Sequence, residues 1–397
     1  MTEWKKVKLG DCCSKIGSGS TPKGGASVYI DSGTSLIRSQ NVYNLFFDYN
    51  GLTHITEEAA NKLKGVTVLM GDILLNITGD SVARTCIVPE DVLPARVNQH
   101  VAIIRTKEDM IESRFLNYYL ASPIMQAHML SLAVGKGASR NAMTKAMIED
   151  FEVPCPPMAT QRRIAEVLSR YDALIENYQR QIKLLEEAAQ RLYKEWFVDL
   201  RFPGHETTPI INNLPTGWQK KKLIEIADVQ YGYAFDGSLF NSDRKGMPIV
   251  RIRNIPDGYT SDYTTEEAST DYIVRNGDIF VGMDGIFHIN TWSGGNAYLV
   301  QRACSFRPKD QLLKGFVFQA IYEPIKYFEK TLVGSTVAHL GKKHIDSIEL
   351  LIPTDNDLFM PFSEMFDERQ NLLAQIRNLA EARDRLLPKL MSGEIEV

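Results

Sequence analysis

The stretch at residues 71–80 reads GDILLNITGD, and the chain repeats it at residues 277–286 as GDIFVGMDGI. Five more pairs occur in the same order: Trp4 with Trp218, Lys8-Leu9 with Lys222-Leu223, LIRSQN from Leu36 with IVRIRN from Ile249, TEEA from Thr56 with TEEA from Thr265, and NQHVAIIR from Asn98 with VQRACSFR from Val300. Chance can produce one short pair, but six in one order indicate an internal duplication.

Two longer matches extend the repeat toward the end of each half. FLNYYLASP from Phe115 matches FVFQAIYEP from Phe316, and GASRNAMTKAMIEDFEVPCP from Gly137 matches GSTVAHLGKKHIDSIELLIP from Gly334. Within a half, the β-branched runs at residues 73–77 and 101–104 predict strands between turns, and residues 115–129 predict a helix. Each half is therefore expected to be a mixed α/β domain.

A long helix is expected between the two halves, because Pro154, Pro156 and Pro157 precede the periodic stretch and Pro203-Gly204 follow it. Its apolar residues alternate spacings of four and three, which is a heptad seam that needs a partner helix. The seam consists of Ile164, Leu168, Tyr171, Ile175, Tyr178, Ile182, Leu185, Ala189, Leu192 and Trp196.

The natural partner is a second helix at residues 362–390. Its apolar side carries Phe366, Leu373, Ile376, Leu379, Leu386 and Leu390. Arg369 and Arg383 interrupt the best heptad frame. Because each helix leaves an equivalent domain, the two are expected to run antiparallel, with a pseudo-two-fold relation between the halves. A generic heptad stretch serves packing alone, but a helix between two copies of one domain also sets their distance.

The expected fold class is α+β, with two duplicated mixed α/β domains separated by two long antiparallel coiled-coil helices. The predicted boundaries are residues 1–157 for the first domain, 158–198 for the central helix, 199–217 for a linker, 218–357 for the second domain, and 358–397 for the distal helix and tail.

The composition is that of a globular protein, with 44% hydrophobic and 24% charged residues in a chain of 397. The start, MTEWKKVKLG, turns polar before a signal peptide can form, and no segment approaches the length of a bilayer span. We therefore expect a cytoplasmic protein with no membrane partner. The five cysteines show neither a disulfide framework nor CxxC spacing, so reduced thiols are expected.

The net charge of −4 excludes a protein that coats nucleic acid by bulk charge. It does not exclude DNA binding, because a mildly acidic chain can concentrate its basic residues on one face.

Motifs for catalysis and metal binding are missing from the sequence. An adenine methyltransferase needs an Asn- or Asp-Pro-Pro-aromatic loop for the flipped base, and the chain contains none. The cluster GSGSTPKGG from Gly17 has Gly25 where a phosphate-binding loop requires Lys, so it predicts a turn. Neither a nuclease carboxylate pair nor a metal-ligand spacing among the seven histidines stands out. We therefore expect no enzyme activity, no cofactor and no metal.

Three stretches are similar to a known family: ATQRRIAEVLSRYDALI from Ala159, LYKEWFVDLRFPG from Leu192, and RDRLLPKLMSGEIEV from Arg383. Together with the duplication, they make essentially the whole chain resemble the specificity subunits of type I restriction-modification systems. The resemblance implies a non-catalytic subunit with two target-recognition domains, each reading one half of a split double-stranded DNA target. It also implies that the coiled-coil pair fixes the gap between the halves.

The resemblance further implies that methylation subunits, expected to number two, dock on the helical regions, and that a restriction subunit joins the complex. The docking residues expected on this basis are Gln161, Arg162, Leu168, Tyr171, Asp172, Phe366 and Asp367. The stretch PTDNDLFMPFSEMFDE before the distal helix lacks the Gln-Arg pair of the central copy, so the symmetry of docking stays open.

Two pairs of loops are candidates for DNA contact, since base readout uses polar side chains on loops that enter a groove. The first pair carries Arg38, Gln40 and Asn41 in one half and Arg251, Arg253 and Asn254 in the other. The alternative is a strand end whose arginine pairs with a nearby acid. The second pair carries Asn76, Thr78 and Asp80 in one half and Met283 and Asp284 in the other, and its alternative is a plain turn.

A third pair of loops is the strongest candidate, because small residues permit close backbone approach and hydroxyl and basic groups suit phosphates. The residues are Lys136, Ser139, Arg140, Asn141 and Lys145 in the first half, and Ser335, Thr336, His339, Lys342 and Lys343 in the second. Since the halves agree in framework and differ in these loops, the expected target is split and non-palindromic.

Three other functions remain open on the sequence. They are the specificity portion of a fused restriction-methylation enzyme, a stand-alone methyltransferase, and a coiled-coil adaptor with no role on DNA. The missing catalytic motifs disfavour the two enzymes.

Overall fold

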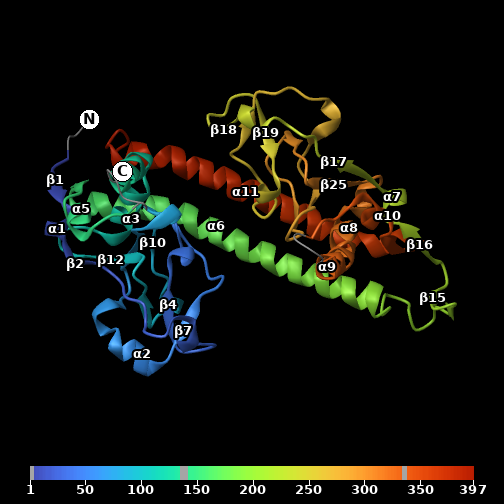
Figure 1. Ribbon diagram of the computed structural model, residues 1–397, viewed down its shortest axis with the longest axis horizontal. Helices are drawn as coiled ribbons and strands as arrows, with labels where there is room; N and C mark the ends of the chain where they lie inside the picture. The colour runs from blue at the N-terminus through green and yellow to red at the C-terminus, as the bar shows by residue number, and fades with distance from the viewer. Residues whose placement is uncertain (1–3, 135–141, 333–337) are drawn as a thin grey trace. The chain divides into compact units, whose positions relative to one another are not determined.

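The computed structural model describes residues 4–134, 142–332 and 338–397. Two compact units make up the chain, one formed by Met1–Ile175 with Asn378–Val397 and the other by Glu176–Arg377. Each unit therefore contains one repeated half together with a part of each long helix (Figure 1).

The first unit is built on two sheets. The smaller sheet has the strand order β10 (Thr85–Ile87), β9 (Ile73–Asn76), β12 (Val101–Thr106), β2 (Cys13–Ser18). The larger sheet has the order β3 (Tyr29–Ile30), β7 (Thr53–Ile55), β4 (Thr34–Ile37), β11 (Ala95–Val97), β8 (Thr67–Val68). Short pairs join β1 (Lys6–Lys8) to β13 (Glu152–Pro154) and β5 (Val42–Tyr43) to β6 (Phe46–Phe47).

The helices of this half are α1 (Leu9–Cys12), α2 (Glu57–Lys62), α3 (Ser113–Ala121), α4 (Pro123–Ala133) and α5 (Lys145–Glu149). Strand residues alternate between two cores: Leu74 and Ile103 pack toward the larger sheet, whereas Leu75 and Ile104 pack toward the helices. The smaller sheet is therefore the middle layer of the domain. In Figure 1, β10 and β12 lie between α6 and the strands β4 and β7, with α2 farthest out.

The second unit repeats both sheets with the same strand order and also repeats the pairing of β1 with β13. Its smaller sheet has the order β17 (Ala227–Tyr231), β25 (Ala303–Pro308), β22 (Ile279–Gly282), β23 (Ile289–Thr291). Its larger sheet has the order β18 (Phe240–Asn241), β20 (Tyr263–Thr264), β19 (Met247–Val250), β24 (Ala297–Leu299), β21 (Ile273–Val274). Two short pairs join β16 (Trp218–Lys222) to β26 (Glu349–Pro353) and β14 (Ile210–Ile211) to β15 (Leu214–Pro215). The helices are α7 (Leu223–Ile226), α8 (Lys314–Ala320), α9 (Tyr322–Thr331) and α10 (Lys342–Asp346).

The predicted duplication is confirmed by this shared topology. Each larger sheet contains one parallel pair, β4 with β11 and β19 with β24, among otherwise antiparallel neighbours. The helix predicted at residues 115–129 is two helices, because Ser122 caps α4 and Pro123 occupies its first turn.

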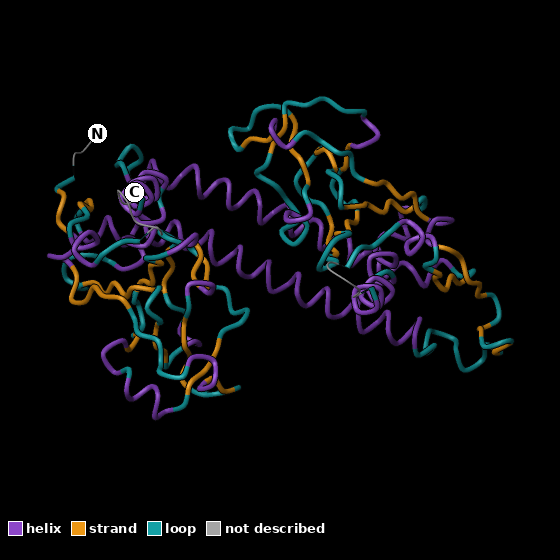
Figure 2. The backbone as a smooth tube through the Cα atoms, in the orientation of Figure 1, coloured by secondary structure: helices purple, strands orange, loops and turns teal. Residues whose placement is uncertain are grey.

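Two long helices complete the fold. The first, α6 (Met158–Tyr193), continues into a π-helical turn at Lys194–Val198, and the second is α11 (Met360–Met391). Both are uninterrupted in Figure 2. In the second unit they pack against one another in antiparallel fashion: Glu186 lies beside Arg369, whereas Tyr193, farther along α6, lies against Phe362, earlier in α11. In the first unit Asp172 of α6 lies beside Arg383 of α11.

Candidate functional site

In each half a residue of the second candidate loop pairs with a described residue at or just after the end of the third, beside the carboxyl end of one strand of the smaller sheet. In the first unit an isolated antiparallel bridge joins Thr78, after β9, to Ala142. In the second unit a bridge of the same kind joins Asp284, after β22, to His339. Thr78 and Asp284 are equivalent in the repeat, as are Ala142 and His339, so both halves build the same junction from different residues.

A third residue reaches this junction from the turn that precedes the strand β12 or β25. His100 Nδ1 lies 2.6 Å from Thr78 Oγ1. At the equivalent place in the second unit, Arg302 Nη1 lies 3.2 Å from Asp284 Oδ2, while His339 Nδ1 lies 2.6 Å from Asp284 Oδ1. Each half thus presents a polar cluster at one edge, and the two clusters differ in charge and in donors.

Neither His100 nor Arg302 was among the contact residues expected from the sequence. The repeat pair NQHVAIIR and VQRACSFR places both at the same position, directly after the shared glutamine, and this polar difference was the available signal.

A glycine in each half lets the chain pass close to this turn. A Cβ on Gly19 would lie 2.1 Å from Val97 O, and a Cβ on Gly232 would lie 2.1 Å from Val300 O. Any larger residue would push the two segments apart. The duplicated glycines therefore fix the backbone of the segment after β2 or β17 against the turn that carries His100 or Arg302.

The first candidate loop is mainly a structural turn. Asn41 is fully buried, and its side chain accepts a hydrogen bond from the Arg38 N–H at 3.0 Å and donates to Asp48 O at 2.9 Å. Asn254 accepts in the same way from the Arg251 N–H at 2.9 Å. These two asparagines hold the loop shape, so neither amide is offered to a ligand in the folded chain.

The arginines of this loop are already engaged. Arg38 donates to Gly51 O at 2.5 Å, and Gln40 lies exposed beside the same carbonyl. Arg251 lies over the ring of Phe240, with its Cζ 5.2 Å from the centroid. Arg253 makes a bidentate ion pair with Asp262 through contacts of 2.7 and 2.8 Å from Nη2. The pairing of Arg253 with an acid is the alternative that the sequence left open for this loop.

The remaining basic candidates lie on short helices beside the junction. Lys145 begins α5 and pairs with Glu149 at 3.4 Å, and Lys342 and Lys343 are exposed at the start of α10. Six further candidates lie outside the described residues: Lys136, Ser139, Arg140, Asn141, Ser335 and Thr336.

A buried ion pair holds the opposite end of the same strands in both halves. Asp72, fully buried, accepts from Arg105 Nε at 2.7 Å, and Asp278 accepts from Arg307 Nε at 3.0 Å. The hydrogen bond that each arginine donates to its carboxylate raises the pKa of that arginine. This pair is the same in both halves, so the framework is constant where the junction varies.

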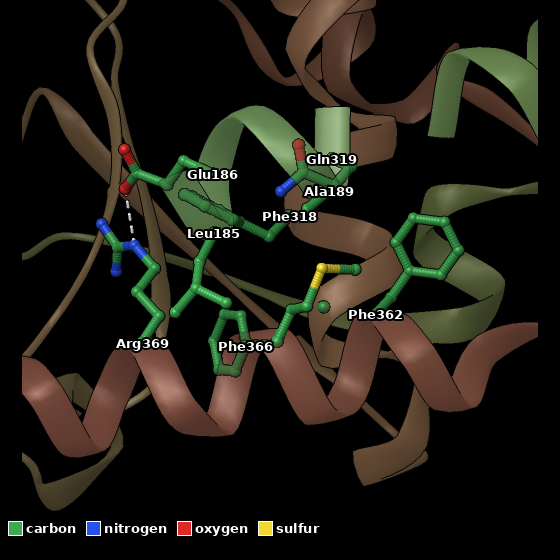
Figure 3. Close-up of a pocket in the computed structure, with 10 residues that line it drawn as sticks. Leu185, Glu186, Ala189, Phe318, Gln319, Phe362, Phe366 and Arg369 are labelled. Carbon is green, nitrogen blue, oxygen red and sulfur yellow. Dashed lines mark hydrogen bonds and ion pairs between the residues drawn. The ribbon is translucent and has the colours of Figure 1, made fainter. Parts of the chain in front are cut away.

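In the second unit, Arg369 of α11 ties both long helices to the smaller sheet. Its side chain is 8% exposed, and its Nε lies 2.6 Å from Glu186 Oε1 of α6. Its Nη2 donates to Asn290 Oδ1 at 2.9 Å and its Nη1 to Thr291 Oγ1, both on β23. Figure 3 shows the ion pair beside Leu185, Phe318 and Phe366, which fill the space around it.

In the first unit, Arg383 of α11 has the corresponding place. Its Nη1 lies 2.6 Å from Asp172 Oδ1 of α6, and the other oxygen of Asp172 accepts from the hydroxyl of Tyr118 on α3. Burial raises the pKa of Tyr118, and the charge of Asp172 raises it further.

The seven residues expected at docking surfaces fall into two groups. Gln161 is 1% exposed, and its side chain accepts a hydrogen bond from Glu112 N and donates one to Pro156 O. Leu168 lies in the hydrophobic core of the first unit and Phe366 in that of the second. Their side chains hold the folded unit together and offer no surface, and Asp172 is engaged with Arg383. Arg162 and Asp367 are exposed, and Tyr171 is half-buried.

Beside Arg162 the first unit has a groove of about 380 Å³. It is lined in part by Leu69, Met70 and Met158, and Met70 is 66% exposed.

Within the described ranges no group of His, Cys, Asp and Glu side chains is arranged to hold a metal ion. None of the helices described is long and apolar enough to cross a membrane. All five cysteines are free.

Comparisons of this chain with family models and with known proteins all match one family. The family model of the type I restriction modification DNA specificity domain matches residues 1–187 and 215–363. The MjaIX specificity subunit of Methanocaldococcus jannaschii is 26% identical over 420 residues, which cover 100% of this chain and 94% of the relative. The HindI specificity subunit of Haemophilus influenzae is 20% identical and covers 100% of both chains.

A solved structure has the same fold. The S subunit of a type I restriction-modification system from M. genitalium superposes with a TM-score of 0.57 at 15% identity, covering 98% of this chain and 96% of that one.

Proposed function

Because the chain belongs to the family of type I restriction-modification DNA specificity subunits, we propose that each of its two domains reads one half of a split DNA target. The chain determines which DNA sequence its restriction-modification system recognises. The recognition domains are proposed to span residues 1–157 and 218–357.

One observation supports two different readers above all others. The halves share strand order, the buried Asp–Arg pair and the close-packed glycine, yet the junction holds Thr78 with His100 in one and Asp284 with Arg302 in the other. Donors and acceptors at the edge of a fixed framework are what base readout requires. A duplicated protein that read a palindrome would carry the same residues at both junctions.

The DNA-contact set proposed here consists of the exposed or partly exposed residues of each junction, the exposed lysines beside it, and the exposed Gln40 of the first candidate loop. In the first domain these are Gln40, Thr78, His100 and Lys145, and in the second they are Asp284, Arg302, His339, Lys342 and Lys343. The lysines suit phosphate contacts, because an ammonium group is a point charge without base specificity. Arg38, Arg251 and Arg253 would have to release their present partners to join the set.

The paired helices α6 and α11 are proposed to set the number of bases between the half-sites. Each helix contributes residues to both units, and each unit buries side chains of both helices. A continuous helix rises about 1.5 Å per residue, so its length is a fixed measure between the domains.

Methylation subunits, which we expect to number two, are proposed to dock on the helical regions, and a restriction subunit to join them. The exposed Arg162 and Asp367 and the half-buried Tyr171 are the docking residues retained here. Catalysis is assigned to those partners and not to this chain. Since the target is cellular DNA, we place the complex in the cytoplasm.

Methylome sequencing of cells with and without this gene tests the proposal. The expected result is one bipartite, non-palindromic motif that is methylated only when the gene is present. Methylation that is unchanged by loss of the gene, or a palindromic motif, would contradict the two-reader account.

A further inference from the structure

We propose that Arg302 reads a guanine in the half-site of the second domain, with Asp284 and His339 as its positioning residues. The inference rests on the proposed function and adds the residue and the base. Three features of Arg302 suit this role: its backbone conformation, its exposed guanidinium, and its single anchoring contact.

The backbone of Arg302 is in the left-handed region, with φ of 73°. This conformation is unfavourable for a residue with a Cβ, and it persists only where surrounding contacts impose it. Here Met283 N donates to Arg302 O at 2.9 Å, and Gln301 N donates to Tyr233 O at 2.8 Å. The turn is thus pinned from two sides, and strained residues held in this way cluster at ligand sites.

The side chain of Arg302 is 58% exposed and anchored at one point. Its Nη1 contacts Asp284 Oδ2 at 3.2 Å, and the guanidinium makes no second ion pair or hydrogen bond within the described part of the chain. Arg253, by contrast, has its planar fork closed by Asp262. Arg302 therefore keeps its Nε and Nη2 donors free, and these two donors match the O6 and N7 acceptors of guanine in the major groove.

Asp284 is itself held in place, which makes the anchor rigid. His339 Nδ1 lies 2.6 Å from its other oxygen, and the backbones of Asp284 and His339 form a bridge. The Asp284 side chain is 28% exposed and that of His339 is 52% exposed. A carboxylate that contacts one corner of a guanidinium orients the group while leaving the other edge available.

The first domain offers a contrast at the same position. His100 stands where Arg302 stands and contacts Thr78 in place of a carboxylate. An imidazole has no pair of parallel N–H donors like that of a guanidinium. The preference for guanine is therefore assigned to the half-site of the second domain only.

The test is methylome sequencing of the assembled system carrying the wild-type chain, Arg302→Ala, Arg302→Lys or Asp284→Asn. For Arg302→Ala we expect an unchanged first half-site and loss of guanine preference at one position of the second, by about 5- to 150-fold. Arg302→Lys keeps the positive charge but loses the two parallel N–H donors of the guanidinium. It should therefore weaken the preference for guanine at the same position. Asp284→Asn should relax it less.

Arg275→Ala is the matched control, because Arg275 is an exposed arginine at the opposite end of β22 and should leave the target unchanged. A retained first half-site shows that a variant chain is folded and assembled. The inference is overturned if Arg302→Ala keeps the wild-type motif, if it weakens all sequences equally with a smaller salt slope, or if the wild-type motif has no guanine in its second half. Failure of the proposed function has a different signature, since the wild-type chain would then direct no bipartite methylation.

Discussion

Arg369 of α11 lies against Glu186 of α6, with 2.6 Å between Nε and Oε1. Arg383 and Asp172 form the matching pair in the other unit, and both arginines and both acids are separated by the same two heptads. The acids lie on α6 and the arginines on α11 in each case. This polarity favours pairing of α6 with α11, because pairing either helix with a second copy of itself would bring like charges together.

Replacing Arg369 by Ala is predicted to destabilise the chain by about 3 kcal/mol. Glu186 would lose its partner in the ion pair, and Asn290 and Thr291 would each lose one of their hydrogen bonds. The free energy of unfolding in urea measures the effect.

Arg180→Ala is the control for this variant. Arg180 pairs with Glu176 on the exposed side of α6, and such pairs contribute about 0.3–0.5 kcal/mol. Equal losses in the two variants would show that the Arg369 network does not hold the second unit together.

Tyr118 is predicted to make stability depend on alkaline pH. Burial raises its pKa above the ordinary 10.0, so below pH 10 the hydroxyl keeps its proton in both the folded and the unfolded chain and its contribution is fully present. As the pH rises past 10, the unfolded chain loses the proton first and the free energy of unfolding falls. Tyr118→Phe should cost about 1–2 kcal/mol at neutral pH and should lose less stability at high pH.

Urea unfolding at about pH 8 and about pH 11 checks this difference. Tyr178→Phe, which removes a tyrosine hydroxyl from α6 and not from α3, is the control and should follow the wild-type slope. If the Tyr118→Phe and wild-type chains lost stability in parallel, the hydroxyl would not be the linked group.

His100→Ala is predicted to alter only the half-site of the first domain. The imidazole and Thr78 form the polar junction there, and each base contact that is lost costs about 1–3 kcal/mol of discrimination. Methylation of a library randomised in both half-sites measures the change, with Lys107→Ala at the other end of β12 as the control. Relaxation of both half-sites together would argue against independent readers.

The purified chain alone is predicted neither to methylate nor to cut DNA, because reaction chemistry is assigned to its partners. Transfer of a labelled methyl group, and cleavage of plasmid carrying the target, are the assays. Activity in a homogeneous preparation free of co-purifying subunits would contradict the assignment.

The sequence predicted the architecture well, because repeats and heptads are local patterns. Residues 73–77 contain the strand β9, residues 101–104 lie within the strand β12, and the seam residue Leu168 is buried. Arg369 and Arg383 looked like interruptions of the distal seam. They lie on it, and their charges are balanced by acids from α6, a partner that the sequence of one helix does not reveal.

The candidate site was harder to predict, since its residues are far apart along the chain. Asn41 and Gln161 are polar residues of the kind that bind ligands, yet both are buried and complete the hydrogen bonding of the fold. Arg302 becomes a candidate contact residue only because Asp284 anchors its guanidinium and His339 pairs with Asp284, and these two residues come from two other loops. Exposure and partner geometry therefore had to come from the structure.

The most direct test of a single chain that reads two half-sites at a fixed distance is a change in helix length. Four helix-forming residues inserted after Ile175 in α6, matched by four after Arg377 in α11, lengthen the pair by about 6 Å. At about 3.4 Å per base pair, the preferred gap should grow by one or two base pairs while both half-sites keep their sequences. The insertion also turns each helix about 40° beyond a full revolution, and DNA bending can absorb part of that rotation. The measurement is methylation by the assembled complex across targets that differ only in gap length. A shifted optimum with unchanged half-sites is the predicted result, and an active, lengthened chain that still prefers the original gap would contradict the account.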